Sequence, residues 1–92
     1  MLVRQWIAER VGRGYVNFER LNNELLARAQ SEGLDVTSRE IRVVLEKLIR
    51  DGAIETCQFL AEDQRYQPTI YDDSNIYWYW FRMREKETHD ER

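Results

Sequence analysis

Residues that could carry nucleophilic or metal chemistry are few in this sequence. It holds one histidine, His89, near its end and one cysteine, Cys57. Nucleophilic catalysis needs a base beside the nucleophile, and a metal site needs clustered Cys, His or carboxylate ligands. The acidic pair Asp72-Asp73 is typical of a solvated loop, and Gly12-Arg13-Gly14 lacks the length and the Lys-Ser/Thr pair of a phosphate loop. We therefore expect no enzyme, no metal and no cofactor.

A different chemistry is available on residues 38–50, where basic side chains recur along one side of an expected helix. At 100° per residue, the side opposite the apolar stripe carries Arg39, Val43, Glu46, Lys47 and Arg50, with Arg42 at its boundary. Arginine and lysine donate to guanine edges or to phosphates. Glu46 repels phosphate unless it accepts from a cytosine amine, so an ordinary solvated helix face is the alternative interpretation.

A third group of candidates stands in residues 76–84, whose aromatic run IYWYWFRMR favours a strand. Alternation predicts a core face of Tyr77, Tyr79, Phe81 and Met83. The opposite face then holds Ile76, Trp78, Trp80, Arg82 and Arg84. Because Trp and Arg are enriched at binding hot spots, Trp78, Trp80 and Arg82 are candidate interface residues, most simply of a homodimer. The alternative is that the preceding loop folds back and covers both tryptophans.

The basic helix is the best-specified element of the chain. Thr37 at the N-cap and Glu40 three residues later form a capping box, and Gly52 takes the left-handed position after the last turn. The core stripe between them comprises Ile41, Val44, Leu45, Leu48 and Ile49. Residues 53–55 leave directly as a strand, so helix and strand are joined without a loop.

Two further helices precede it. Residues 2–11 place Val3, Trp6, Ile7 and Val11 on one face, and the glycines at 12 and 14 end that helix. Tyr15-Val16 is a short extended segment, and Asn17 is the expected N-cap of the next helix. That second helix buries Phe18, Leu21, Leu25 and Ala29, with Leu26 beside them, and ends at Gly33.

After Leu60 the pattern becomes polar and contains the single proline, Pro68. We expect residues 61–75 to form a long hairpin loop, with residues 67–71 as optional extended backbone. Its one basic residue, Arg65, stands against Glu62, Asp63, Asp72 and Asp73. Such an acidic loop is a poor phosphate clamp and suits a protein contact better.

Length and composition set the remaining limits. Ninety-two residues make one domain, expected at 1–84, with a charged tail at 85–92. No apolar run approaches the ~20 residues of a membrane helix, and a lone cysteine suits a reducing cytoplasm. Residues 1–50 carry a net charge of +2 and residues 51–92 carry −5. Nucleic-acid binding would therefore depend on a local patch in the first half.

The order helix, short strand, helix, helix, strand, loop, strand over residues 2–84 resembles the winged helix-turn-helix superfamily. The segment LEKLIRDGAIE, residues 45–55, resembles the junction between the third helix and the wing of that superfamily. The resemblance implies an α+β fold with three helices, a small antiparallel sheet and a long wing hairpin. It also implies that the third helix lies in the DNA major groove and that the wing touches the DNA backbone or minor groove.

From this resemblance we expect a sequence-specific, double-stranded DNA-binding transcriptional regulator, and the Trp–Arg face of the last strand makes a homodimer the expected assembly. On the helical wheel, Arg39, Arg42 and Val43 would read bases. Lys47 and Arg50 would contact phosphates, and Arg65 is the one basic residue available on the wing. The alternative function is a winged-helix protein-interaction module that uses the aromatic last strand and the acidic wing.

Overall fold

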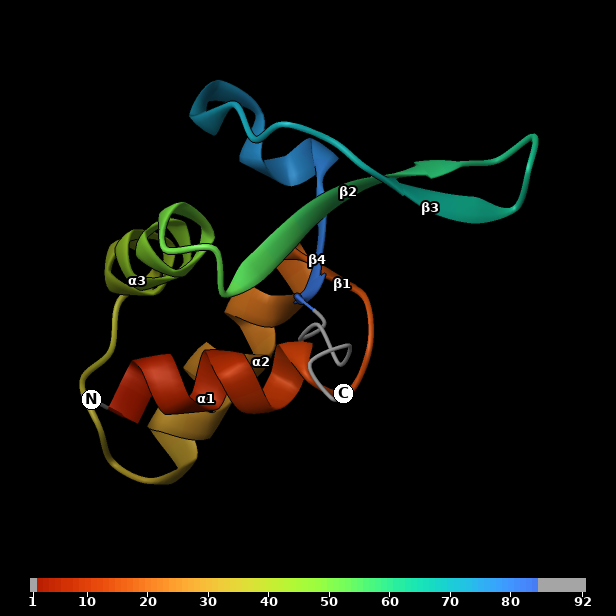
Figure 1. The fold of residues 1–92 in the computed structure, drawn as a ribbon. Helices are drawn as coiled ribbons and strands as arrows, with labels where there is room; N and C mark the ends of the chain where they lie inside the picture. Colours follow the sequence, from red (N-terminus) through yellow and green to blue (C-terminus); the bar gives the residue numbers. More distant parts are fainter. Residues whose placement is uncertain (1, 85–92) are drawn as a thin grey trace, which may run out of the picture.

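The computed structural model describes residues 2–84, which form three α-helices, one 3-10 helix and a four-stranded antiparallel sheet (Figure 1). In chain order the elements are α1 (Leu2–Val11), β1 (Val16–Asn17), α2 (Phe18–Ser31), α3 (Ser38–Arg50), β2 (Ile54–Leu60), β3 (Arg65–Pro68), the 3-10 helix η1 (Asp73–Trp78) and β4 (Trp80–Met83). The fold is therefore α+β, as predicted. Residue 1 and the tail at 85–92, which includes His89, lie outside the described residues.

Local capping signals set the helix boundaries. The side chain of Asn17 accepts from the backbone N–H of Arg20 at 2.9 Å, and that of Thr37 accepts from Glu40 at 3.1 Å. At the end of α3, Gly52 has φ +82°, and the next N–H, that of Ala53, donates to the Leu48 carbonyl. This is the Schellman arrangement, which turns the chain directly from α3 into β2.

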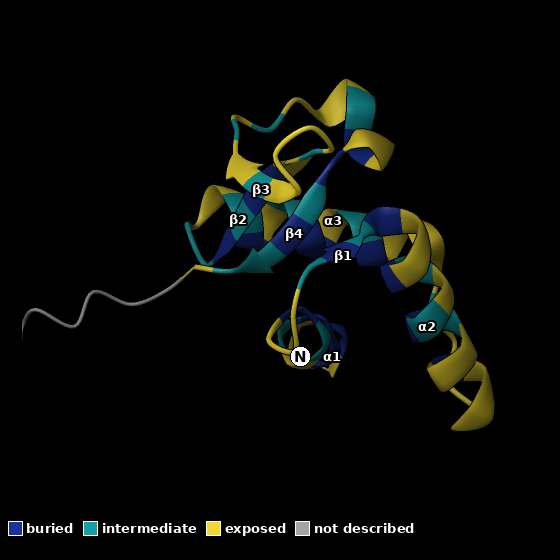
Figure 2. Cartoon of the chain, turned by 90° about the vertical axis from the view of Figure 1, so that its right-hand side faces the viewer, coloured by how far each residue is buried: buried dark blue, intermediate teal, exposed yellow. Residues whose placement is uncertain are grey.

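The core lies where the three α-helices meet one face of the sheet, and buried residues concentrate there (Figure 2). Every residue predicted for the stripes of α1 and α2 is buried except Leu26, which is partly buried. In α3, four of the five predicted stripe residues are buried, and Ile49 packs against them partly exposed. The largest fully enclosed side chains are Trp6 and Phe81, so the first helix and the last strand share one core.

The sheet has the order β1-β4-β2-β3, and β2 is divided between two partners. Residues Ile54 to Cys57 pair with β4, whereas Cys57 to Leu60 pair with β3. The β2–β3 hairpin consequently extends beyond the body of the molecule, on the side away from α3 (Figure 1). Residues 61–75 are thus not one long loop: a tight turn at 61–64 joins two strands, and β3 begins at Arg65, before the optional segment at 67–71.

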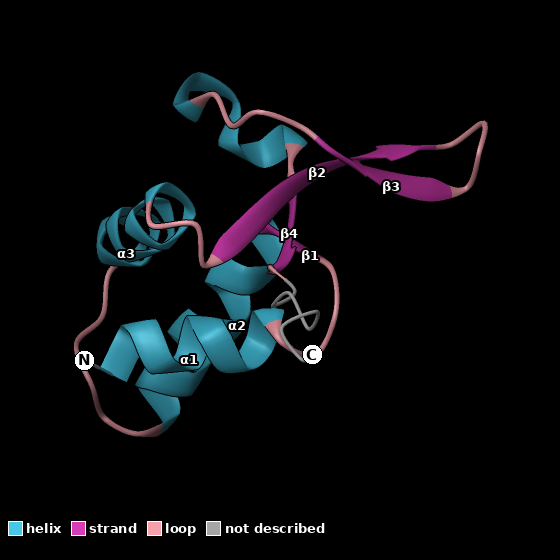
Figure 3. Cartoon of the chain, in the orientation of Figure 1, coloured by secondary structure: helices cyan, strands magenta, loops and turns pink. Residues whose placement is uncertain are grey.

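The prediction of a strand over 76–84 is wrong in its first half, where η1 replaces it (Figure 3). Asp72 caps η1 by accepting from the backbone N–H of Ser74 at 3.1 Å. Because a 3-10 helix has three residues per turn, burial follows a spacing of three. Ile76 and Tyr79 are thus 2% and 6% exposed, whereas Tyr77 is 65% exposed. Ile76 and Tyr77 therefore exchange their expected places.

Alternation does hold from Tyr79 onward. Tyr79 and Phe81 point into the core, Met83 packs at its margin, and Trp80 is half-buried on the other face of the sheet. The strand prediction is therefore correct for β4 alone. The aromatic residues of 76–84 are compatible with both a strand and a short helix. Composition alone therefore does not show where the helix ends and the strand begins.

Two adjacent valines of α3 give a matched test of the packing. Val44 is 8% exposed and Val43 is 53% exposed. Val44→Ala removes buried methyl groups and should lower the free energy of unfolding by about 2 kcal/mol. Val43→Ala should leave it within about 0.5 kcal/mol, because this side chain is largely solvated. Urea denaturation followed by circular dichroism measures both, and equal losses would contradict the helix orientation.

Candidate nucleic-acid interface

The outer face of α3 is open along its length. Arg39, Val43, Lys47 and Arg50 are all exposed there. Among the described residues, no ion pair involves Arg39 or Arg50. Lys47 Nζ lies 3.7 Å from Asp51 Oδ2, an exposed i,i+4 pair of the kind that contributes only about 0.3–0.5 kcal/mol. The helix therefore presents three cations to solvent over about 16 Å of its axis.

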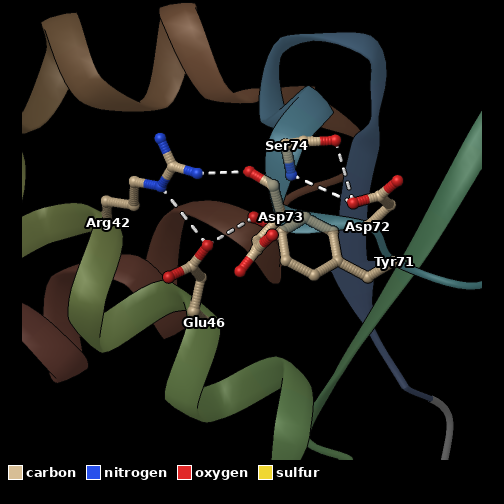
Figure 4. A network of polar contacts seen from close by, with 6 residues as sticks. All are labelled: Arg42, Glu46, Tyr71, Asp72, Asp73 and Ser74. Carbon is tan, nitrogen blue, oxygen red and sulfur yellow. Dashed lines mark hydrogen bonds and ion pairs between the residues drawn. The ribbon is translucent and has the colours of Figure 1, made fainter.

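The neighbouring flank of α3 is covered by the connection between β3 and β4. Arg42 Nε donates to Glu46 Oε2 at 3.3 Å, and Arg42 Nη2 donates to the backbone carbonyl of Asp73 (Figure 4). The Tyr71 hydroxyl donates to the same Glu46 oxygen at 2.7 Å. We call these four groups, Arg42, Glu46, Tyr71 and the Asp73 carbonyl, the Arg42 clamp. The clamp fastens residues 71–73 to the middle of α3.

Ionisation in and beside the clamp follows from these contacts. Burial and the hydrogen bond to Glu46 raise the pKa of Tyr71, so its hydroxyl remains a donor at neutral pH. Burial alone would lower the pKa of Arg42, but the hydrogen bond and the charge of Glu46 outweigh it and raise that pKa. The backbone and hydroxyl of Ser74 lower the pKa of Asp72. This flank thus holds a neutralised Arg42–Glu46 pair with an ionised carboxylate beyond it.

Arg65 does not join the basic face. It lies on β3, in the hairpin that projects away from α3 (Figure 1), and its Nε is 3.3 Å from Asp63 Oδ2. Arg39, Val43, Lys47 and Arg50 share one continuous surface, and Arg42 borders it. The basic residues predicted to contact DNA are thus divided between the outer face of α3 and the β2–β3 hairpin.

The outer face of the sheet carries an aromatic cluster around Tyr66. Its ring stacks on Tyr15 with centroids 3.7 Å apart and meets Trp80 edge-on at 5.4 Å. Cys57, paired with Trp80 in the ladder, is fully buried, and burial raises the pKa of its thiol. Arg82 donates to Glu55 at 2.7 Å. The aromatic rings and Cys57 form a second, smaller apolar layer on this face of the sheet, bordered by the Arg82–Glu55 pair. The sequence around Tyr15 and Tyr66 did not predict this layer.

The predicted interface residues are consequently separated. Trp80 and Arg82 are half-buried in that layer, whereas Trp78 at the end of η1 is 68% exposed. Trp78 lines a shallow hollow with the last three residues of β2, Gln58–Leu60, and with Trp80. The alternative in which the loop covers both tryptophans therefore applies to Trp80, which packs against Tyr66, and not to Trp78.

The sequence indicated neither Tyr71 nor Asp73 as part of a site. The run Asp72-Asp73-Ser74-Asn75 is a recognisable turn and cap signal and could have located η1. Nothing local indicates that Tyr71 reaches Glu46, because the two are 25 residues apart. That contact follows from the path of the chain between β3 and β4.

Comparisons of this chain with models of protein families, with curated proteins and with solved structures gave no match. Within residues 2–84, no three His, Cys, Asp or Glu side chains are grouped so that they could hold a metal ion. None of the helices in that range combines the length and the apolar character needed to cross a membrane.

The clamp gives a test of stability against pH. Tyr71→Phe removes one donor to a carboxylate and should lower the free energy of unfolding by about 1–2 kcal/mol at pH 7. Because the folded-state pKa of Tyr71 is raised, its stabilisation is complete below its ordinary pKa of 10.0 and is lost as the pH rises above it. Urea titrations at pH 7 to 10.5 should show the gap between wild type and variant narrowing.

Tyr77→Phe is the control, because Tyr77 is 65% exposed. It should leave stability unchanged at every pH. A gap between wild type and Tyr71→Phe that stayed constant above pH 10 would contradict the hydrogen-bonded arrangement.

Proposed function

We propose that this protein is a winged-helix transcriptional regulator that binds double-stranded DNA with α3 in the major groove. The observation that carries the proposal is the open outer face of α3, where Arg39, Lys47 and Arg50 stand exposed on a helix anchored by its buried stripe. The order of elements and the three-helix core packed on an antiparallel sheet suit this fold. A rigid helix with cations on its free side suits a groove lined by phosphates.

Each exposed residue of this face has a chemical role available to it. Arg39 lies in the first turn of α3, the part of a recognition helix that reaches base edges, and Val43 one turn later could contact a thymine methyl. Lys47 and Arg50 lie in the last turn, where they would hold phosphates. Base reading and phosphate contact are thereby assigned to successive turns of one helix.

The hairpin has a lesser part in this proposal. The β2–β3 turn carries Glu62 and Asp63, and Arg65 beside it is paired with Asp63. A hairpin that extends away from α3 with acidic residues at its tip cannot supply several phosphate contacts. We therefore expect few such contacts per chain and modest affinity, which pairing of two chains on two half-sites would raise.

Salt dependence tests the DNA proposal. Binding to random-sequence duplex, measured by fluorescence anisotropy from 50 to 200 mM salt, should give a log-log slope of about −3 to −5 for three to five phosphate contacts. Lys47→Ala combined with Arg50→Ala should reduce the magnitude of that slope by about 2, because each phosphate contact contributes about 0.9.

Arg13→Ala is the matched control for that pair. Arg13 follows α1, is exposed, and takes part in no ion pair found within residues 2–84. The slope should not change in this variant. Absence of binding at about 50 mM salt, or an equal effect of Arg13→Ala, would refute DNA binding by α3.

A second candidate function, protein interaction, is favoured by one observation, the exposure of aromatic side chains beside the hairpin. Tyr77 and Trp78 are 65% and 68% exposed, and Phe59 is 41% exposed. Exposed aromatics of this size are enriched at binding hot spots, and a second copy of the chain in twofold symmetry is the simplest partner. This surface lies on the hairpin side of the molecule, so it is compatible with DNA binding by α3.

Oligomeric state tests this surface. Trp78→Ser should convert a dimer to a monomer by light scattering, and the monomer should stay folded by circular dichroism because this side chain is largely solvated in the single chain. Its melting temperature should fall only to the value that the wild type shows when diluted to monomer. Trp80→Ser should lower the melting temperature further, since Trp80 packs against Tyr66. A wild-type protein that stays monomeric at millimolar concentration would argue against self-association through Trp78.

A further inference from the structure

We propose that Tyr71 and Glu46 are positioning residues that hold Arg42 ready to read a guanine base, an inference that rests on the proposed DNA binding. The connection between β3 and β4 then has a role in recognition as well as in joining two strands. It orients one arginine at the border of the open face of α3, and that arginine determines specificity.

The donor geometry of Arg42 supports this role. A guanidinium has five N–H donors, and the two bonds in the clamp occupy Nε and one N–H of Nη2. The two engaged nitrogens, Nε and Nη2, are those of one edge of the planar group. The other N–H of Nη2 and both of Nη1 make no hydrogen bond within residues 2–84. An arginine with one edge anchored and its end free has the parallel donor pair that matches guanine O6 and N7.

Exposure and position agree with this role. The Arg42 side chain is 39% exposed, so the clamp does not bury it. It lies one turn from Arg39, and side chains three residues apart on a helix are neighbours. The free end of Arg42 therefore borders the surface that carries the other candidate base contacts. Figure 4 shows Nη1 on the side of the guanidinium away from Glu46 and Asp73.

The clamp also assigns a role to Glu46, the residue that counts against DNA binding in the sequence. Its Oε2 accepts from both Arg42 and Tyr71, and its side chain is only 18% exposed. The carboxylate is thus a neutralised partner of Arg42 and not a bare charge facing phosphates. Because the clamp restricts the rotamers of Arg42 during folding, less side-chain entropy is lost when DNA binds.

A clamp that only fastened the chain would give a different result from one that positions Arg42. Loss of a structural fastening would lower stability and weaken binding to all duplexes equally. Loss of a positioning contact would weaken discrimination at one base and leave the salt dependence unchanged, since the number of phosphate contacts stays the same. Discrimination at a single guanine is therefore the decisive measurement.

The experiment begins with selection from a random duplex library by the wild-type protein. Each guanine of the preferred site is then replaced in turn by 7-deazaguanine, which lacks the N7 acceptor. We expect about a tenfold loss of affinity at one guanine, the scale of a good bidentate contact. Tyr71→Phe should reduce this loss to less than about threefold with an unchanged salt slope, and Tyr77→Phe should retain it in full.

Two further variants keep the test valid if Tyr71→Phe folds poorly. Arg42→Lys keeps the charge but has no planar donor pair, so it should lose the guanine discrimination at constant salt slope. Glu46→Gln keeps an acceptor oxygen for Arg42 or Tyr71 and should retain more discrimination than Glu46→Ala. Circular dichroism and melting temperatures confirm folding of each variant before binding is compared.

The outcomes separate the two proposals. A wild-type protein that binds no duplex overturns both the function and the role of Arg42. A wild-type protein that binds a preferred site, while Arg42→Lys and Tyr71→Phe keep its guanine discrimination, overturns only the positioning role. Equal loss on every duplex in these variants, with no change at the deazaguanine position, would identify the clamp as a structural fastening.

Discussion

Burial of one side of α3 is the constraint on which the rest of the structure depends. Ile41 and Leu45 are completely buried, so the helix has a single rotation about its axis that satisfies the core. That rotation sends the basic residues outward along one line. The glycine turn at residue 52 then commits the chain to β2, because the last carbonyls of α3 are satisfied only when the chain reverses there. Helix orientation, surface charge and the start of the sheet thus follow from one apolar stripe.

The division of β2 between two partners explains the clamp. β3 pairs on one edge of β2 and β4 on the other, so residues 69–79 must cross from one edge to the other. The crossing passes beside α3, where Tyr71 and Asp73 find Glu46 and Arg42. The same crossing leaves the end of η1 beside residues 58–60 of β2, which pair with β3 and have no β4 partner, and Trp78 is exposed there. Both candidate surfaces of the molecule therefore arise from one feature of the topology.

The parts of this fold that the sequence predicts are those determined by near neighbours in the chain. The N-caps at Asn17 and Thr37 and the three helical stripes depend on neighbours within one or two turns, and they are confirmed, with Leu26 and Ile49 only partly buried. Of the reciprocal capping box at Thr37, the structure of residues 2–84 has the bond from the Glu40 N–H and not the return bond to the Glu40 carboxylate. The prediction of a strand over 76–84 is wrong at its start because aromatic residues that favour a strand are also compatible with a short helix. Asp72 caps that helix. The helical wheel puts Arg42 at the border of the open face, with Glu46 one turn away on the same helix, but the Asp73 carbonyl that also accepts from Arg42 comes from a segment 31 residues away. Periodicity carries no information about such partners.

The pairing of β1 has a consequence for the order of folding. Its two residues pair only with β4, and Val16 faces Phe81 across the ladder. The first strand therefore has no partner until the last strand is in place, and closing that long loop costs entropy before the contact stabilises anything. The three helices and the β2–β3 hairpin are built from short-range contacts and can form earlier. From the separation of these strands in the sequence, we expect closure of the sheet to be the late step that joins the two ends of the described chain in one core.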